Sequence, residues 1–268
     1  MKTFFFKHLR VFRVIAMIIA IAATAWLIWF GCALSGNPVS YFLVKSSSQK
    51  YVAENYPGFV AENPGYNFKF GNYFVRISKP GSDDSSFVAS FGLNGRFLYD
   101  NYEGNVTNGY NTRLRLETRY RELVKSVLES PASPFETDIG FGELIFARDS
   151  DNEERYPAHD FSIPTDILEP DGIYDIAALG EIGGVLDICV CSEDKSPERA
   201  AEILRELDAL MTKGGVTFRA IDLTLESSDR EYYTAENIHR EEISQNDLAE
   251  IVIQKHNAYE ARFASIEK

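Results

Sequence analysis

The chain has 268 residues, of which 45% are hydrophobic and 25% are charged, so it has room for one large or two ordinary globular domains and is not disordered in composition. Its formal net charge of −13 disfavours nucleic acid as a partner, because an acidic body without a basic stripe repels phosphates. Three cysteines are too few for a disulfide framework in a chain of this length.

Charge is unevenly distributed along the chain. The segment 1–13 has no acidic residue, and its cations are Lys2, Lys7, Arg10 and Arg13. Removing these four from the 27 cations leaves 23 against 40 acids, so the rest of the chain carries a net charge of −17. The first acid of the whole chain is Glu54. A basic head on an acidic body indicates a membrane protein.

The segment 14–34 is apolar apart from Thr24, and it is long enough to cross a bilayer as a helix. Trp26 and Trp29 lie near its outer end, where aromatic rings favour the headgroup region. The cations before it favour a cytosolic N-terminus. The sequence therefore predicts a single-pass protein of the cell membrane that contacts the bilayer through 14–34, with 1–13 as a cytosolic tail and the C-terminus outside.

Two alternatives to this anchor stay open. A cleaved signal peptide shares the basic start, and a small-residue cleavage site is conceivable around Ala33 and Ser35, but its apolar region is usually shorter. A lipoprotein anchored through Cys32 would have Gly31 in a suitable position, whereas Trp29 is poorly suited to such a signal.

The next segment, 36–129, reads as one small α+β domain. Asn37 and Pro38 are a good helix opening, and this helix is expected to end near Asn55. Alternating patterns predict strands at 66–70, 72–78, 86–91 and 96–100, and Asn94-Gly95 indicates a tight hairpin between the last two. Helical spacing of apolar residues predicts a closing helix over about 111–129. The expected order is α-β-β-β-β-α.

The segment 130–134, with two prolines, reads as an interdomain linker. The second domain, 135–268, alternates strand and helix, with strands expected at 142–148, 185–192 and 216–226. A short helix is expected near 173–182, a second from Ser196 to Gly214, and a long last one after Ser244. An α/β sandwich of ferredoxin-like type follows from this alternation, so the overall fold class is α+β.

Several short motifs carry a resemblance to a known family: Gly36-Asn37-Pro38-Val39-Ser40, Tyr66-Asn67-Phe68-Lys69-Phe70, Gly109-Tyr110-Asn111-Thr112, Ile139-Gly140-Phe141-Gly142-Glu143, Tyr174-Asp175-Ile176 and Ala220-Ile221-Asp222-Leu223. On these motifs the chain resembles the YfjL-like family of membrane-anchored proteins from Gram-positive bacteria, over nearly all of its length after the apolar segment. The first domain also resembles, more distantly, the PepSY-type modules of extracytoplasmic proteins, through Glu54-Asn55-Tyr56-Pro57-Gly58. These are mostly turn and core residues, so the resemblance implies location and architecture and no reaction.

Two residue groups have the composition of metal sites without the full pattern. Cys189 and Cys191 share one face of an expected strand, but no further Cys or His pair completes a four-ligand set, so two small residues buried under a helix are the preferred interpretation. The acidic loop 149–154 lacks the Gly and the bidentate Glu of a calcium loop, because Glu154 and Asp160 stand at those positions. Weak calcium binding at extracellular levels stays open. No metal or cofactor is predicted.

No catalytic motif is complete. His159, His239 and His256 belong to no nucleophile or zinc motif, and His239 and His256 read as surface residues. Gly140 and Gly142 lack the lysine of a phosphate loop, so close backbone packing is the better interpretation. No catalytic, cofactor-binding or metal residue is therefore assigned.

The sequence favours a non-catalytic envelope protein in which a membrane tether presents two small domains that bind, sense or scaffold. Its acidic surface would attract a protein or a cationic peptide. The alternative is an extracytoplasmic enzyme whose site is assembled from Asp, Glu and His residues that form no recognised motif.

Overall fold

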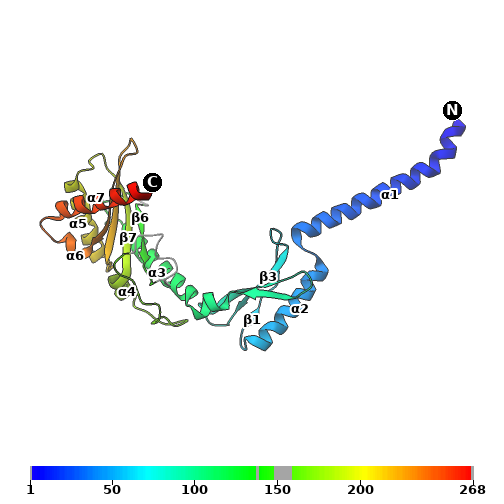
Figure 1. Ribbon diagram of the computed structural model, residues 1–268, viewed down its shortest axis with the longest axis horizontal. Coiled ribbons are helices and arrows are strands. Elements are labelled where there is room, and N and C mark those ends of the chain that lie inside the picture. The colour runs from blue at the N-terminus through cyan, green and yellow to red at the C-terminus, as the bar shows by residue number, and fades with distance from the viewer. Residues whose placement is uncertain (1, 137–138, 148–158, 267–268) are drawn as a thin grey trace. The chain divides into compact units, whose positions relative to one another are not determined.

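The computed structural model describes residues 2–136, 139–147 and 159–266, and the chain divides into two compact units, Met1–Asn108 and Gly109–Lys268 (Figure 1). Both units combine helices with a sheet, which confirms the predicted α+β class. Each has its own hydrophobic core.

The chain begins with one long helix, α1 (Lys2–Ser35). It is long and apolar enough to cross a membrane, and its apolar side chains, among them Ile18, Ile21 and Trp29, are exposed. The hydroxyl of Thr24 donates to the carbonyl of Ala20 at 2.9 Å, so this polar side chain is satisfied within the helix. Such a helix suits a membrane anchor, because lipid covers the apolar side chains and the backbone is hydrogen-bonded internally.

The remainder of the first unit packs one helix against an antiparallel sheet. Its elements are α2 (Pro38–Asn55), β1 (Val60–Ala61), β2 (Gly65–Asn67), β3 (Asn72–Ser78), β4 (Ser86–Phe91), β5 (Phe97–Asp100) and a π-helical turn, η1 (Glu103–Thr107). Strands β3, β4 and β5 are neighbours in that order, and β1 and β2 both pair with β3. As predicted, the side chain of Asn37 caps α2, accepting from the backbone N–H of Val39 at 2.8 Å.

Helix α2 packs on the sheet because every fourth residue of one stripe is buried: Ser40, Val44, Ser48 and Val52. On the sheet side the core contains the alternate residues Tyr73, Val75 and Ile77 of β3. The end of the helix is held to β5 through the carboxylate of Asp100, which accepts hydrogen bonds from the hydroxyls of Tyr51 and Tyr56.

Two details of this sheet differ from the sequence expectation. The first predicted strand, 66–70, is shorter, because Phe68 to Gly71 form the turn between β2 and β3. The hairpin at Asn94-Gly95 exists, but its loop spans 92–96 and only Gly95 takes a positive φ. A Cβ at Gly95 would lie 2.8 Å from the Ser47 hydroxyl, so the loop also has to pass close to α2.

The second unit covers one face of a four-stranded sheet with helices. Its elements are α3 (Tyr110–Leu128), β6 (Gly140–Leu144), α4 (Ile176–Gly183), β7 (Gly184–Cys191), α5 (Pro197–Lys213), β8 (Ala220–Glu226), β9 (Tyr232–His239), α6 (Arg240–Ile243) and α7 (Leu248–Ile266). The strands lie in the order β6-β7-β8-β9, and only β7 and β8 are parallel.

This order corrects the ferredoxin-like prediction. In a ferredoxin-like or split βαβ sheet another strand lies between the two parallel strands. Here β7 and β8 are direct neighbours joined by α5, and one antiparallel strand flanks them on each side. The second unit is therefore a plain βαβ core with antiparallel edges. Strand β9 is missing from the sequence expectation, because its exposed side is polar and Asn237, at φ +56°, interrupts the alternation.

Helix α3 belongs to the second unit, which corrects the domain boundaries at 36–129 and 135–268. Its Tyr120 is fully buried, and the hydroxyl donates to the carbonyl of Thr217 at 2.8 Å. Three glycines make room for this ring, since a Cβ at Gly142 or Gly180 would lie 2.8 Å from it and one at Gly184 would lie 2.4 Å from its oxygen. The segment 130–134 therefore links α3 to β6 inside one unit.

Candidate functional site

The second sheet buries only one of its faces under helices. In β7, Leu186, Ile188 and Val190 are buried in a core that they share with α3, α5 and α7, whereas the residues between them are exposed. Strand β8 alternates in the same way. We call the opposite side the open face. The residues that it leaves exposed or partly covered are Phe141, Glu143, Asp187, Cys189, Cys191, Asp222, Thr224, Glu226, Tyr232 and Glu236, and Thr234 is buried among them.

The open face is acidic across all four strands. Arg121 of α3 lies 3.6 Å from Glu143 at the β6 edge, and Arg262 of α7 pairs with Glu236 on β9. Between these ion pairs, Asp187 and Asp222 stand opposite each other in the parallel register of β7 and β8. Burial raises the pKa of the Asp187 carboxyl, and the charges of Glu143 and Glu236 raise it further. The centre of the face therefore favours an added positive charge.

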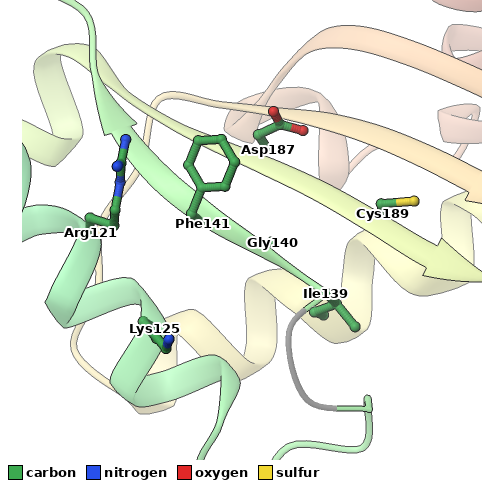
Figure 2. A pocket seen from close by; sticks show the side chains of 7 residues that line it. All are labelled: Arg121, Lys125, Ile139, Gly140, Phe141, Asp187 and Cys189. Carbon is green, nitrogen blue, oxygen red and sulfur yellow. The ribbon is translucent and has the colours of Figure 1, made fainter. Parts of the chain in front are cut away.

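A cavity of about 360 Å³ lies where the open face meets α3. Figure 2 shows the cations of α3 on one side, Asp187 and Cys189 of β7 on the other, and the edge strand β6 between them. The guanidinium of Arg121 lies 5.0 Å from the centre of the Phe141 ring. The remaining lining residues are Lys125, Ile139 and Gly140. This cavity offers an aromatic surface between charges of opposite sign.

Close packing of the β6 glycines is confirmed. A Cβ on Gly140 would lie 2.0 Å from the Asp187 carbonyl oxygen, and one on Gly142 would lie 2.5 Å from a methyl of Val124. Both positions need glycine, because a side chain would collide with the β7 backbone at Gly140 and with α3 at Gly142. These glycines lie in β6, at the edge of the cavity.

The two cysteines of β7 are not buried, which corrects the sequence interpretation. Cys189 and Cys191 are exposed free thiols on the open face, because the helices cover the other face of the strand. Burial and the carboxylate of Glu226 raise the pKa of the Cys189 thiol, which makes its nucleophilic thiolate less available. Within the described ranges, no group of three or more His, Cys, Asp or Glu side chains is placed to hold a metal ion. The loop 149–154 lies outside the described residues.

One end of the open face brings a carboxylate, an amide and an imidazole together. Burial raises the pKa of Asp222 to about 6, against the opposing effects of the Asn237 N–H and of His159. The Asn237 N–H donates to the Asp222 carboxylate at 2.6 Å, and its side-chain oxygen lies 3.3 Å from Nδ1 of His159. From the sequence, Asp222 was noted only within a family motif and without a role, and Asn237 was not noted. The sequence signal that could have identified Asp222 is an acidic residue between the apolar residues Ile221 and Leu223 of an expected strand.

The ring of Phe161 joins His239 to this group, because it contacts the rings of both His159 and His239, whereas His256 lies on α7. His239 is buried rather than on the surface, with Nε2 3.2 Å from a carboxylate oxygen of Asp160. His256 is partly buried on α7, where its ring stacks on Tyr233 at 4.0 Å between ring centres and its Nδ1 lies 2.9 Å from the Thr234 carbonyl oxygen.

Comparison with known proteins gives two matches along the chain. A model of the YfjL-like N-terminal domain matches residues 11–101, and a model of the YfjL-like C-terminal domain matches residues 119–254. The two matches lie on either side of the boundary between the compact units, and the second one begins inside α3. No curated protein and no solved structure matches the chain.

Proposed function

The chain belongs to the YfjL-like family, and from this premise we propose that it is a membrane-tethered, non-catalytic binding module of the cell envelope. In this proposal α1 crosses the membrane with its basic flank in the cytosol. Both units then lie outside. The open face of the second unit binds a cationic peptide or a cationic segment of a protein.

The orientation rests on charge. Four cations and no acid precede the apolar part of α1, and a net charge of −17 follows it. Cations beside a transmembrane helix favour the cytosolic side, and an acidic body is repelled by anionic headgroups. Both effects favour the same orientation.

The observation that carries the binding proposal is the uncovered face of the second sheet. Exposed sheet residues beside a mixed aromatic and charged cavity are typical of an interaction surface. Asp187 and Glu226 lie on this face, and the pKa of the Asp187 carboxyl is raised by burial and then by the charges of its acidic neighbours. A cationic ligand would relieve that repulsion, and the acidic body would speed its approach.

A second candidate, an extracytoplasmic hydrolytic or proton-transfer enzyme, is favoured by one specific observation. The pKa of Asp222 is raised to about 6, and Asn237 contacts this carboxylate through its backbone N–H and His159 through its side-chain oxygen. A carboxyl group that titrates near neutral pH beside an imidazole is a recognised acid–base arrangement. In this candidate Asp222 would exchange the proton and His159 would support it.

The test of binding uses the full chain in discs of neutral phosphatidylcholine and a fluorescent oligolysine peptide as the probe. The double variant Asp187→Asn with Glu226→Gln removes two charges from the open face. Its matched control, Glu206→Gln with Glu250→Gln, removes two charges from exposed positions on α5 and α7. We expect the open-face variant to weaken binding about tenfold, from two exposed ion pairs of about 0.7 kcal/mol each, and the control to change it less than about twofold.

Equal weakening by both variants would show that net charge alone attracts the probe, and the open face would lose its assignment. The enzyme candidate is tested separately, by rescue of a deletion phenotype with His159→Ala. Loss of rescue by a folded, normally abundant His159→Ala protein would place the enzyme ahead of the binding module.

A further inference from the structure

The turn between β2 and β3 presents two aromatic side chains to solvent. Phe68 is 69% exposed and Phe70 is 70% exposed, and the Lys69 ammonium between them lies 5.7 Å from the centre of the Phe70 ring. The turn is nevertheless well ordered by hydrogen bonds. Asn67 accepts from the backbone N–H of Lys69 through its side chain at 3.1 Å and from that of Gly71 through its carbonyl at 2.8 Å. Two exposed phenyl rings on one hydrogen-bonded turn form a small apolar surface that an apolar phase can cover.

This turn is attached to the end of the membrane-spanning helix. The pair Tyr66 and Tyr73 lies one register position before the last pair of the β2–β3 hairpin, and the Tyr73 hydroxyl donates to the carbonyl of Asn37 at 2.9 Å. Gly36, the residue after α1, approaches both rings so closely that a Cβ there would lie 2.4 Å from the Tyr73 oxygen. Figure 1 shows the hairpin of β2 and β3 beside the C-terminal end of α1.

The start of α2 adds apolar surface next to the same point. Val39 is 67% exposed and Phe42 is 68% exposed, and both follow the end of α1 within a few residues. The stretch 36–53 contains Lys45 and Lys50 and no acid. Exposed aromatic and aliphatic groups with cations and without carboxylates are the composition that favours a lipid headgroup region.

We propose that the tip of the β2–β3 hairpin, Phe68 to Phe70, inserts into the headgroup region of the bilayer that α1 crosses, with Val39 and Phe42 facing the same surface. The proposal rests on the membrane tether of the proposed function. The hairpin then acts as a second contact with the membrane. It holds the first unit in one orientation on the bilayer, which a single flexible tether would not do.

The occupant is argued from continuity with the spanning helix. The hydrogen bond from Tyr73 to Asn37 ties the β2–β3 hairpin to the chain directly after α1. Tyr73 is three residues after Phe70, so the hairpin tip lies near the end of α1. Lipid is therefore the nearest apolar phase that this part of the chain meets once α1 is inserted. Lys69 lies between Phe68 and Phe70 in sequence, and a lysine at the headgroup level can bring its ammonium to phosphate groups while its stem lies along the apolar boundary.

The test uses tryptophan fluorescence of the full chain in phosphatidylcholine vesicles with lipids brominated near the headgroup. The native tryptophans are Trp26 and Trp29, so both are replaced by Phe before a probe is introduced. The probe is Phe70→Trp, and the matched control is Leu98→Trp, an exposed position on β5 of the same unit. We expect the probe at 70 to lose most of its fluorescence and to shift to the blue, and the probe at 98 to keep both its intensity and its wavelength.

A third protein, which keeps Trp26 and carries only Trp29→Phe, reports whether α1 is inserted. Quenching of Trp26 together with an unquenched probe at 70 would overturn the hairpin proposal and leave the tether intact. An unquenched Trp26 would overturn both. Equal quenching of the probes at 70 and 98 would show that the unit lies on lipid without a preferred contact, which also contradicts the proposal.

Discussion

Asp222 has an environment that is unfavourable to its charge. It lies in β8 with apolar neighbours in sequence, and burial raises the pKa of its carboxyl to about 6 from the usual value of 3.8. A pKa that is higher in the folded chain than in the unfolded chain contributes stability below about pH 4, and this contribution is lost as the pH rises through about 6. At neutral pH the ionised carboxylate therefore lowers the stability of the fold.

Replacing Asp222 with Asn should stabilise the protein at neutral pH. The rise of the pKa from 3.8 to about 6 corresponds to at most about 3 kcal/mol at neutral pH, so we expect a gain of about 1–3 kcal/mol. The amide oxygen of Asn can still accept the hydrogen bond from the Asn237 N–H. Urea unfolding of the full chain at about pH 7.5 measures the difference in the free energy of unfolding.

The same comparison at about pH 3.5 is the control, because the protonated carboxyl and the amide are then both neutral and the difference should vanish. A gain that is equal at both pH values would show that packing, and not charge, distinguishes the two side chains. The same protein also bears on the enzyme candidate, since a stabilised Asp222→Asn that fails to rescue a deletion would indicate a functional carboxylate.

Single residues were predictable from the sequence only where the cause is local. The cap at Asn37 and the positive φ of Gly95 follow from side-chain chemistry and were expected. That Cys189 and Cys191 share a face also follows from strand alternation. Which face the helices cover depends on residues far away in sequence, so the exposure of both thiols could not be predicted. The raised pKa of Asp222 could not be predicted for the same reason, because it depends on burial by residues far away in sequence.

At the scale of elements, α3 is held in the second unit by a buried ring. Gly142, Gly180 and Gly184 surround Tyr120, and each would meet it closely if it carried a Cβ. The periodicity of α3 predicted its bounds within one residue at each end. A buried stripe shows that a helix packs but does not identify the sheet that it packs on, so its unit was assigned wrongly.

Gly184→Ala should therefore destabilise the second unit by about 1–3 kcal/mol through overpacking. The added methyl would lie 2.4 Å from the Tyr120 oxygen and 2.6 Å from the Gly180 carbonyl oxygen, and neither can move without disturbing α3 or α4. Thermal unfolding measured by circular dichroism reports the loss. Gly104→Ala is the control, because a Cβ there meets nothing within 4 Å. A comparable loss of stability in both variants would contradict the close packing of these glycines around Tyr120.

At the scale of the whole molecule, the boundary between the units lies at Asn108 and Gly109. A fragment of residues 109–268 should therefore fold alone, with dispersed amide signals in its NMR spectrum. A fragment of residues 135–268 lacks α3, whose buried side chains Leu116, Tyr120 and Val124 belong to the core of that unit, and should be unfolded or aggregated. A well-folded 135–268 fragment would restore the boundary expected from the prolines of the segment 130–134.

The orientation of the whole chain is the property on which both proposals depend, and cysteine labelling of intact cells tests it. The native thiols are removed first by Cys32→Ala, Cys189→Ser and Cys191→Ser. Ser46→Cys then places one thiol on an exposed position of α2, and Thr3→Cys places one in the basic flank. A membrane-impermeant maleimide should label position 46 in intact cells, and should label position 3 only after the membrane is opened.

The same proteins distinguish the helix anchor from its two alternatives. An uncleaved helix keeps the chain in the membrane fraction with position 3 still attached, even though Cys32→Ala removes the only residue that could be lipidated there. A cleaved signal peptide would release a shorter protein without position 3, and a lipoprotein would lose its mature anchor in the Cys32→Ala background. Labelling of position 3 in intact cells, with position 46 protected, would invert the orientation. The open face and the β2–β3 hairpin would then act on the cytosolic side of the bilayer. The positive flank of α1 would lie outside, against the preference of cations for the cytosolic side.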